Sequence, residues 1–486
     1  MNLKSGLPLV FQPWNRPARA GPRSLWLQEA LSEESDFEAN LQQLRGSHRA
    51  DVCIVGGGFT GLWTAIRLKE MEPSLEVTIV EAGLCGSGAS GRNGGIVVGW
   101  WWKLPTLTEL CGQENGRRLL RASLAAIDDI ASVCERHGIK GAFRRAGWCW
   151  TATNSAQMGA WRRAVEQARA LGLDEWVDAD RNQLEQSLGS AAHFGGVIDT
   201  TAGVAQPAKL ARGLRRLALE MGVQIFERSP VLSVGGSPLV VRAEVGNITT
   251  DQVVLAANAW MTHFAPFRDH VFTVSSDVIA TEPLRGRFAE RDSRWTQSWS
   301  DSGLKVRYAR TTDDDRIVFG RGGGTLAYKN RVTDEFEVSP AQTTSLKKDF
   351  VRVFPALATA GITHAWAGPV DRSVVGVPAF GRLEADPRLV YAIGYSGTGV
   401  GPSAAGGRML ASTVLGRHDE ASDMARLLTG IQRLSRLPPE PIRYIAGRVV
   451  QRAVERKEQA EDNGRIPSCA VSTLARFVPA PVETRS

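Results

Sequence analysis

Three glycines and one glutamate near the start of the chain have the types and spacing that bind a dinucleotide. Residues 56–61 read Gly-Gly-Gly-Phe-Thr-Gly and satisfy the pattern G-x-G-x-x-G. Gly56 permits a tight turn, Gly58 lets a pyrophosphate approach the backbone, and Gly61 allows a helix to pack closely against a strand. Glu81 follows Gly61 by twenty residues, a suitable place for a carboxylate that accepts hydrogen bonds from a ribose diol.

Two strands and a helix must position these residues. Residues 51–55 are apolar and β-branched, which predicts a buried parallel strand. Apolar residues recur at helical spacing from 62 to 71, and residues 75–80 predict a second strand that ends on Glu81. The free N–H groups and the positive dipole end of the helix attract an anion. Glycine-rich turns without function also satisfy the pattern, but this context favours dinucleotide binding.

Two further passages are rich in glycine. The small side chains of residues 86–95 indicate backbone that presses against a flat or bulky group; a flexible loop is the alternative. Residues 394–401 read Gly-Tyr-Ser-Gly-Thr-Gly-Val-Gly, between a predicted strand at 389–393 and a predicted helix at 403–415. Two separate glycine turns at strand–helix junctions favour FAD over NAD, because a nicotinamide enzyme would not require the second.

A family resemblance rests on three of these features. The pattern at 56–61, the acid at Glu81 and Gly-Ala-Ser-Gly-Arg-Asn-Gly-Gly at 88–95 resemble the FAD-dependent amine and amino-acid oxidoreductases related to D-amino-acid oxidase. Glycine oxidase, sarcosine oxidase and the γ-glutamylputrescine-oxidising enzymes belong to this group, and residues 90–95 are most similar to the last. The resemblance covers roughly residues 49–417. It implies FAD contacts from Gly56, Gly58, Phe59, Thr60, Gly61, Glu81, Ala82, Ser90, Arg92, Asn93, Gly94, Gly95, Val231, Asn258, Gly397, Thr398, Gly399 and Val400.

The expected fold combines an α/β domain with an α+β domain. The resemblance implies a Rossmann-like FAD-binding domain that carries the G-x-G-x-x-G turn, and a discontinuous substrate domain built on an antiparallel sheet. The segments are a 1–48 N-terminal extension; 49–105, 195–260 and 365–417 for the FAD-binding domain; 106–194 and 261–364 for the substrate domain; and a 418–486 C-terminal helical extension.

The implied reaction is the oxidation of a C–N bond in an amine or amino acid. A hydride leaves the carbon next to a neutral amine and reaches flavin N5, and the resulting imine hydrolyses. This chemistry needs positioning and desolvation more than a side-chain base. Backbone N–H groups of the 397–401 turn would stabilise the negative charge that develops at flavin N1 and the C2 carbonyl. No catalytic residue is identified from the sequence.

Four side chains are candidates for the substrate pocket. Tyr308 and Arg310 share one face of a predicted strand. In the resembling family the corresponding sheet covers the flavin, whereas isolated residues of these types usually lie on the surface. Trp366 lies at the start of segment 365–417, the last segment predicted for the FAD-binding domain. Trp100 begins a run of three tryptophans, which form either an aromatic wall near the flavin or the packing of a domain boundary.

Two other function classes stay open. Residues 99–105 nearly match the G-W-x-W-x-I-P signature of flavin-dependent halogenases, although that signature lies much farther from the glycine turn in those enzymes. A halogenase or monooxygenase acting on an aromatic substrate is therefore one alternative, and a non-catalytic flavoprotein subunit is another. The sequence leaves open the amine, the choice between oxidase and dehydrogenase, and the oligomeric state.

We expect FAD to be held without a covalent bond. Sarcosine-oxidase relatives attach the flavin through a cysteine, and the matching stretch here, residues 371–378, contains none. Other relatives use a histidine shortly after the first glycine turn, and none lies between Gly61 and Trp102.

Composition and charge limit the classes of partner that we expect. The 486 residues carry a net charge of +7 without a basic block that interleaves aromatics, so we expect no nucleic-acid partner. Neither the six cysteines nor the seven histidines show metal-ligand spacing, so no metal is expected. No apolar stretch reaches eighteen residues, which predicts no membrane span and a cytoplasmic location. The expected partners are an amine or amino acid and either oxygen or another electron acceptor.

Overall fold

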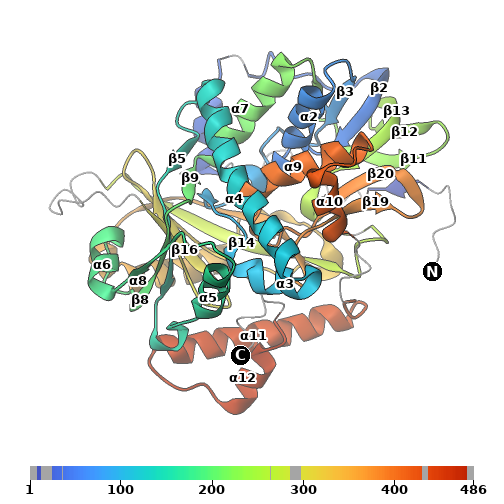
Figure 1. Cartoon of the computed structure of the whole chain (residues 1–486). Coiled ribbons are helices and arrows are strands. Elements are labelled where there is room, and N and C mark those ends of the chain that lie inside the picture. Colours follow the sequence, from blue (N-terminus) through green and yellow to red (C-terminus); the bar gives the residue numbers. More distant parts are fainter. Residues whose placement is uncertain are drawn as a thin grey trace.

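The computed structural model describes residues 8–11, 24–35, 37–262, 264–284, 297–429 and 436–478, and the statements below concern these residues. Two large sheets and one small sheet form the framework. In Figure 1 the nine-stranded sheet lies in the upper right part of the molecule, and the eight-stranded sheet lies in the lower left part.

The nine-stranded sheet has a parallel centre. Its order is β10-β3-β2-β13-β20, with the bounds β10 (Gln224–Phe226), β3 (Val77–Val80), β2 (Gly46–Val55), β13 (Gly246–Leu255) and β20 (Asp386–Ile393). Four strands add antiparallel pairings: β12 (Leu239–Ala243), β11 (Val231–Gly235), β1 (Leu9–Val10) and β19 (Ala379–Leu383).

Both faces of this parallel centre are covered, which explains its continuous apolar strands. Along β2, Val52 and Ile54 pack into one core cluster, and Cys53 and Val55 pack into another. Helices α2 (Phe59–Met71), α7 (Pro207–Glu220) and α9 (Val400–Val414) contribute to the first cluster, together with α4 (Gln113–Arg136) and α3 (Leu104–Cys111) (Figure 1). Gly407 lets α9 approach α2 closely, because a Cβ there would lie 2.5 Å from the Cβ of Trp63.

The eight-stranded sheet is antiparallel except where β15 meets β6. Its order is β18-β14-β17-β16-β15-β6-β8-β7. The strands are β18 (Ile362–Ser373), β14 (Val271–Thr281), β17 (Ile317–Arg321), β16 (Arg307–Thr311), β15 (Ser298–Asp301), β6 (Trp148–Ala152), β8 (Gly195–Asp199) and β7 (Trp176–Ala179). Helices α8 (Pro340–Val353) and α6 (Arg181–Leu188) pack on it, and α5 (Arg162–Ala170) packs against α3.

A small sheet lies between these two. It joins β4 (Ile96–Val97) and β5 (Phe143–Arg145) to the two sides of β9 (Gly203–Ala205).

The strand pairings correct parts of the predicted segment borders. Strand β8, expected in the FAD-binding segment that starts at 195, pairs with β6 and β7 in the eight-stranded sheet. Strand β18 pairs with β14 over almost its whole length, so residues 365–373 also belong to that sheet rather than to the nucleotide sheet. The N-terminal segment is integrated too, because β1 pairs with β11 and helix α1 (Leu25–Ser32) packs against α7.

The described part of the C-terminal segment contains helices α10 (Glu420–Leu427), α11 (Ile442–Asp462) and α12 (Cys469–Ala475). Helix α10 packs on α9, whereas α11 and α12 form a separate layer along the lower side of the molecule in Figure 1. Of the helices within the described ranges, none is long and apolar enough to cross a membrane.

Candidate active site

Two adjoining cavities lie where the glycine turns meet the eight-stranded sheet. The central cavity has a volume of about 340 Å³ and the nucleotide cavity a volume of about 130 Å³. They share five lining residues: Phe59, Thr60, Ala89, Ser90 and Asn258. The walls therefore form one elongated site that begins at the first glycine turn and continues toward the sheet.

The first glycine turn forms one wall of the nucleotide cavity, and its backbone admits only glycine at two positions. Gly56 has a φ of +113°, and a Cβ there would lie 2.6 Å from the carbonyl oxygen of Ala256. A Cβ on Gly61 would lie 2.0 Å from the carbonyl oxygen of Gly56. Gly58 caps α2 and has no side chain to cover the first-turn N–H groups, so this helix end can receive an anion.

The Glu81 carboxylate lies at the end of β3 in the same cavity. It accepts hydrogen bonds from the backbone N–H groups of Gly57 and Gly83, each at 2.7 Å. Burial raises the pKa of Glu81, while these two hydrogen bonds act in the opposite direction. Each carboxylate oxygen accepts more than one hydrogen bond, so acceptor capacity remains for a ribose. Ala82 and Val231 line the cavity beside it.

The second glycine passage forms the boundary between the cavities. Ser90 accepts a hydrogen bond from the Phe59 N–H at 2.8 Å, which joins the two turns. Arg92 and Asn93 line the central cavity, but their polar groups already have protein partners. Arg92 forms an ion pair with Glu337 and donates to the carbonyl of Ala367, and the Asn93 amide donates to two backbone carbonyls.

Close packing explains the last two glycines of this passage. A Cβ on Gly94 would lie 2.5 Å from the ring of Tyr308, and Gly94 lines the central cavity. Gly95 does not line it; a Cβ there would lie 2.2 Å from the carbonyl oxygen of Ala205. Its small size therefore serves the contact with β9.

The closing glycine turn forms the opposite wall of the central cavity. Gly397, Thr398, Gly399 and Val400 line it, and α9 begins at Val400. The Asp371 carboxylate accepts a hydrogen bond from the N–H of Gly394, where the turn begins, and burial raises the pKa of Asp371 to about 6. The turn is thereby fixed to β18.

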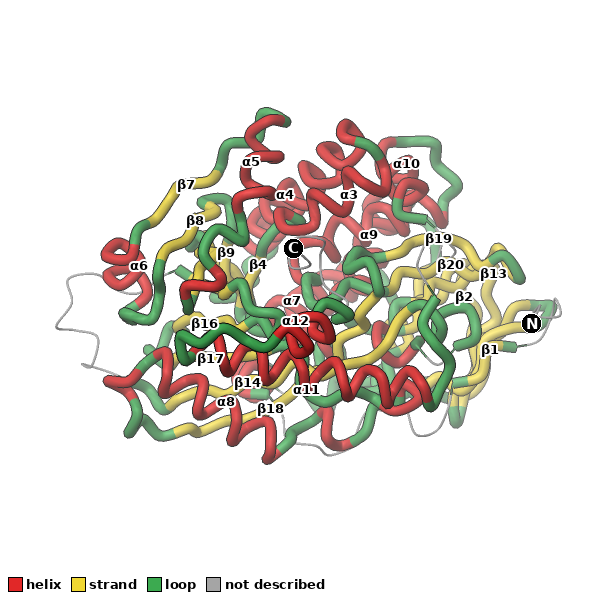
Figure 2. The backbone as a smooth tube through the Cα atoms, turned by 90° about the horizontal axis from the view of Figure 1, so that it is seen from below, coloured by secondary structure: helices red, strands yellow, loops and turns green. Residues whose placement is uncertain are grey.

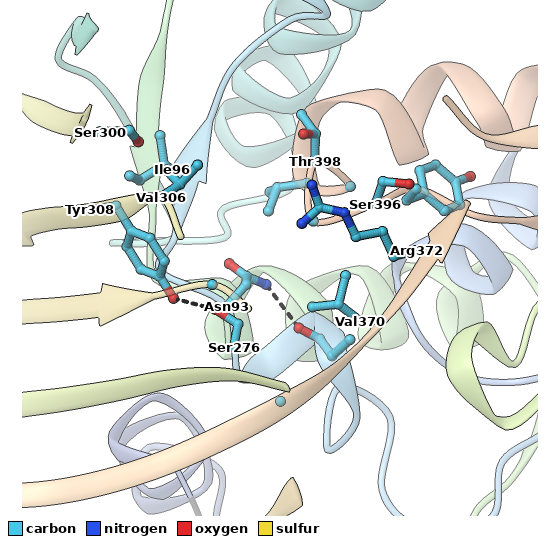
Figure 3. Close-up of a pocket in the computed structure, with 18 of the residues that line it drawn as sticks. Asn93, Ile96, Ser276, Ser300, Val306, Tyr308, Val370, Arg372, Ser396 and Thr398 are labelled. Carbon is cyan, nitrogen blue, oxygen red and sulfur yellow. Dashed lines mark hydrogen bonds between the residues drawn. The ribbon is translucent and has the colours of Figure 1, made fainter. Parts of the chain in front are cut away.

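Of the four predicted pocket side chains, Tyr308 alone lines the central cavity. Its hydroxyl forms a hydrogen bond with the Ser276 hydroxyl (Figure 3), with 2.9 Å between the oxygens, and burial raises the pKa of Tyr308 to about 12. The phenol is therefore neutral at physiological pH.

The other three candidates are placed outside the cavity wall. Arg310 shares a strand face with Tyr308, but its guanidinium donates to the carbonyls of Ala205 and Gly95. Trp366 is 2% exposed and donates to the carbonyl of Arg92, and Trp100 is completely buried. Arg310 and Trp366 thus join neighbouring segments, and Trp100 is part of the core.

The aromatic wall comes from other tryptophans. Trp102, Trp148 and Trp150 line the central cavity, and their ring centroids lie 5.3 to 6.4 Å apart. The tryptophan run thus contributes its third member to the cavity and buries its first two. Helical periodicity could not choose among three adjacent tryptophans, because the segment is a short 3₁₀ turn.

Two basic residues of the central cavity were not predicted. Arg372 reaches into the cavity from β18 near Thr398 (Figure 3), and its guanidinium forms no hydrogen bond or ion pair with any residue in the described ranges. Lys103 donates from Nζ to the carbonyl oxygen of Tyr395 at 2.9 Å. Burial and the charge of Arg372 lower the pKa of Lys103 to about 7, and burial lowers that of Arg372 to about 10.

Strand alternation does not single out Arg372. The consecutive β18 residues Gly368, Pro369, Val370, Asp371 and Arg372 all line the cavity. The position of Arg372 beside the closing turn depends on long-range packing, which no local pattern records.

Comparison with known proteins identifies the family. The family model described as FAD dependent oxidoreductase (DAO) matches residues 51–413. The chain belongs to this family. It is 31% identical to a probable oxidoreductase OrdL of Haemophilus influenzae over 80% of this chain and 88% of that protein. It is 28% identical to the γ-glutamylputrescine oxidoreductase of Escherichia coli over 80% of this chain and 89% of that protein.

A solved structure shows the same fold. The crystal structure of glycine oxidase from Geobacillus kaustophilus matches 77% of this chain and 96% of its own chain with a TM-score of 0.62 at 21% identity. The predicted combination of a nucleotide-binding sheet with a second, largely antiparallel sheet is therefore confirmed.

Membership of the DAO family confirms FAD as the cofactor and makes the chain an FAD-dependent oxidoreductase. The walls fit that cofactor: the first glycine turn, where Gly58 gives α2 no side-chain cap, and the Glu81 carboxylate suit the diphosphate and ribose, and the larger cavity beside them is bounded by the closing glycine turn. The halogenase alternative is not favoured, because the whole span from 51 to 413 matches the DAO family. The individual FAD contacts remain predictions.

Proposed function

We propose that this DAO-family enzyme oxidises the C–N bond of an amino acid, that is, an amine that also carries a carboxylate. Arg372 is the observation that carries this choice. A partly buried guanidinium without a protein partner is costly, and a carboxylate binds it through charge-assisted, often bidentate hydrogen bonds. The names of the relatives support an amine or amino acid as the substrate.

The walls of the central cavity supply the other requirements. Trp102, Trp148 and Trp150 present apolar rings that exclude water from the reacting carbon. The neutral Tyr308 hydroxyl and the Ser276 hydroxyl add polar groups that can orient the amine. Bound FAD supplies the two-electron acceptor.

Lys103 is suited to accept a proton from the substrate. The substrate must lose its ammonium proton before hydride transfer, and an amine with a pKa of about 7 accepts a proton near neutral pH. Its Nζ remains tied to the Tyr395 carbonyl, beside the closing turn.

Matched pairs of compounds test the substrate class. The holoenzyme is mixed anaerobically with alanine or ethylamine, and with phenylalanine or phenethylamine, while flavin absorbance is followed. We expect the amino acid of each pair to bleach the flavin more efficiently. Bleaching by the plain amines alone would refute the carboxylate requirement, and bleaching that requires NAD(P)H would indicate a monooxygenase.

The first prediction concerns Arg372. Arg372→Met should weaken the apparent affinity for the amino acids by at least about tenfold, since it removes hydrogen bonds between charged groups, each worth about 1.5–3 kcal/mol. The values for the plain amines should not change. Arg388→Met, which removes a partly exposed arginine that pairs with Asp386 on the nucleotide sheet, is the matched control. If Arg372→Met weakened the apparent affinity equally for an amino acid and for its matching plain amine, Arg372 would lie outside the carboxylate site.

The remaining partners are also proposals. We infer that electrons pass to oxygen or to another acceptor, with no nucleic-acid partner. A cytoplasmic location is supported by six cysteines that are all free thiols in the structure.

A further inference from the structure

Two short segments form part of the outer rim of the central cavity, where Val306 lines the cavity and is 40% exposed. Residues 302–306 join β15 to β16, and Gly322 and Gly323 follow β17. Because Arg307 at the start of β16 pairs with Arg321 at the end of β17, both segments lie at the same end of the sheet. Ser302, Gly303, Leu304 and Val306 line the cavity from the first segment, and both glycines line it from the second.

Helix α11 holds the first rim segment through polar and apolar contacts. The Glu458 carboxylate accepts a hydrogen bond from the Lys305 N–H at 2.8 Å, and the Lys305 ammonium pairs with Glu455 at 2.6 Å. Leu304 packs against Ala453 and Val454. The position of this segment is thus fixed by three kinds of contact with one helix.

The same helix holds the second rim segment. The Gln451 amide donates to the carbonyl oxygens of Gly324 at 2.7 Å and of Gly323 at 3.4 Å. At the end of α11, Asp462 pairs with Arg307, which also pairs with Asp301 on the cavity wall. Figure 2 shows α11 in front of the strands that carry both segments.

Ordinary apolar packing does not account for this arrangement. Among the described residues of α11, the buried side chains are Ala453, Val454 and Glu458, while Ile442 and Ile445 on its outer face are 59% exposed. The helix is held chiefly by directed polar contacts, and these end on the segments that line the cavity. It also lies outside the span that the DAO family model matches.

We propose that α11 is a specificity element of the active site. Gln451, Glu455 and Glu458 are positioning residues that keep the two rim segments close together and so limit the size of the amine that enters. The inference rests on the proposed function only in calling the entering molecule an amine. The family fold supplies the reaction site, and this helix sets its opening.

Alkylation of a cysteine placed inside the cavity tests the proposal without turnover. Ser300 lines the central cavity (Figure 3), so Ser300→Cys is introduced into the holoenzyme together with Cys469→Ser, which removes the exposed thiol. The rates of reaction with N-ethylmaleimide and with the bulkier fluorescein-5-maleimide are measured. Their ratio reports the opening and is independent of the intrinsic reactivity of the thiol.

Two glutamines of α11 provide a matched pair of variants. Gln451→Leu should raise the relative rate of the bulky reagent by about fivefold, the population shift expected from losing one hydrogen bond of about 1 kcal/mol. Gln459→Leu, which alters an exposed side chain of the same helix, should leave the ratio unchanged. If Gln451→Leu fails to fold, Glu455→Gln tests the other rim segment in the same way. A ratio equal to that of the parent in the folded rim variant would overturn the proposal.

Turnover adds a second measurement. In Gln451→Leu, the rate of flavin reduction by phenylalanine should increase relative to the rate with alanine. In Gln459→Leu, the ratio of these two rates should equal that of the parent. Failure of every amine and amino acid to bleach the parent enzyme would refute the proposed function, and the alkylation ratio would still decide the role of α11.

Discussion

At the scale of single residues, two arginines of neighbouring strands differ in what their guanidinium groups can bind. Arg310 donates to the carbonyls of Thr311, Gly95 and Ala205, whereas the guanidinium of Arg372 has no partner among the described residues. Gly95 and Ala205 are more than a hundred residues distant from Arg310 in the chain, so no local pattern reveals that Arg310 is occupied. Gly56 and Gly61, in contrast, are fixed by close approaches at their own turn, which local spacing indicates.

Glu81 gives the second residue-scale prediction. Glu81→Ala should lower FAD affinity at least about tenfold, because charge-assisted hydrogen bonds to the ribose are each worth about 1.5–3 kcal/mol. The carboxylate also accepts hydrogen bonds from the N–H groups of Gly57 and Gly83. Part of the loss of FAD affinity would therefore come from the loss of these contacts within the protein. Glu81→Gln keeps an acceptor in place and should lose less. Titration of the apoproteins with FAD measures both values, and an unchanged dissociation constant in Glu81→Ala would contradict the assignment.

Lys103 gives a prediction about pH. Its pKa falls from the usual 10.5 to about 7 in the folded protein, so between these values the unfolded chain binds more protons and the free energy of unfolding rises with pH. The penalty for burying the charged ammonium is fully present below pH 7. Lys103→Met should therefore gain more stability over the parent at pH 6 than at pH 9, by on the order of 2 kcal/mol. Urea unfolding at both pH values measures the gain, and equal gains would show that Lys103 titrates normally.

At the scale of elements, local periodicity predicted the strands and helices better than it predicted which sheet each strand joins. The strand–turn–helix unit of β2 and α2 lies at the predicted residues. Residues 365–417 were expected in the FAD-binding domain, but the hydrogen bonds of β18 go to β14. Sheet membership depends on long-range pairing, which a single sequence does not record.

The N-terminal segment illustrates the same limit. Residues 1–48 were expected to form an extension, and α1 within them buries five of its eight residues against α7 and the neighbouring strands. The Ser24 hydroxyl donates to the carbonyl of Gly91, and Trp26 donates to that of Asn93. This helix therefore supports the second glycine passage from outside, a role that its amphipathic pattern alone does not indicate.

At the scale of the whole molecule, the family match and the two cavities indicate how FAD is retained. FAD without a covalent bond is held by diphosphate, ribose and ring contacts distributed over both cavities, and these contacts exist only in the folded protein. Among the described residues, no cysteine or histidine lines either cavity, which agrees with the absence of a cysteine from 371–378. Cys85 lies nearest to the first glycine turn, where burial and neighbouring carboxylates raise its pKa and keep it a thiol.

Non-covalent retention is thus the last prediction. Acid precipitation abolishes the fold and all contacts that depend on it, so the yellow colour should appear in the supernatant and the washed pellet should be colourless. Mass spectrometry of the denatured chain should give the mass calculated from the sequence. Tyr308 and Tyr395 are two of the nucleophilic side chains among the described residues that line the central cavity, so Tyr308→Phe and Tyr395→Phe are variants to examine if colour stays in the pellet. Colour retained in the pellet by the parent and released in one of these variants would contradict the prediction and identify the attachment residue.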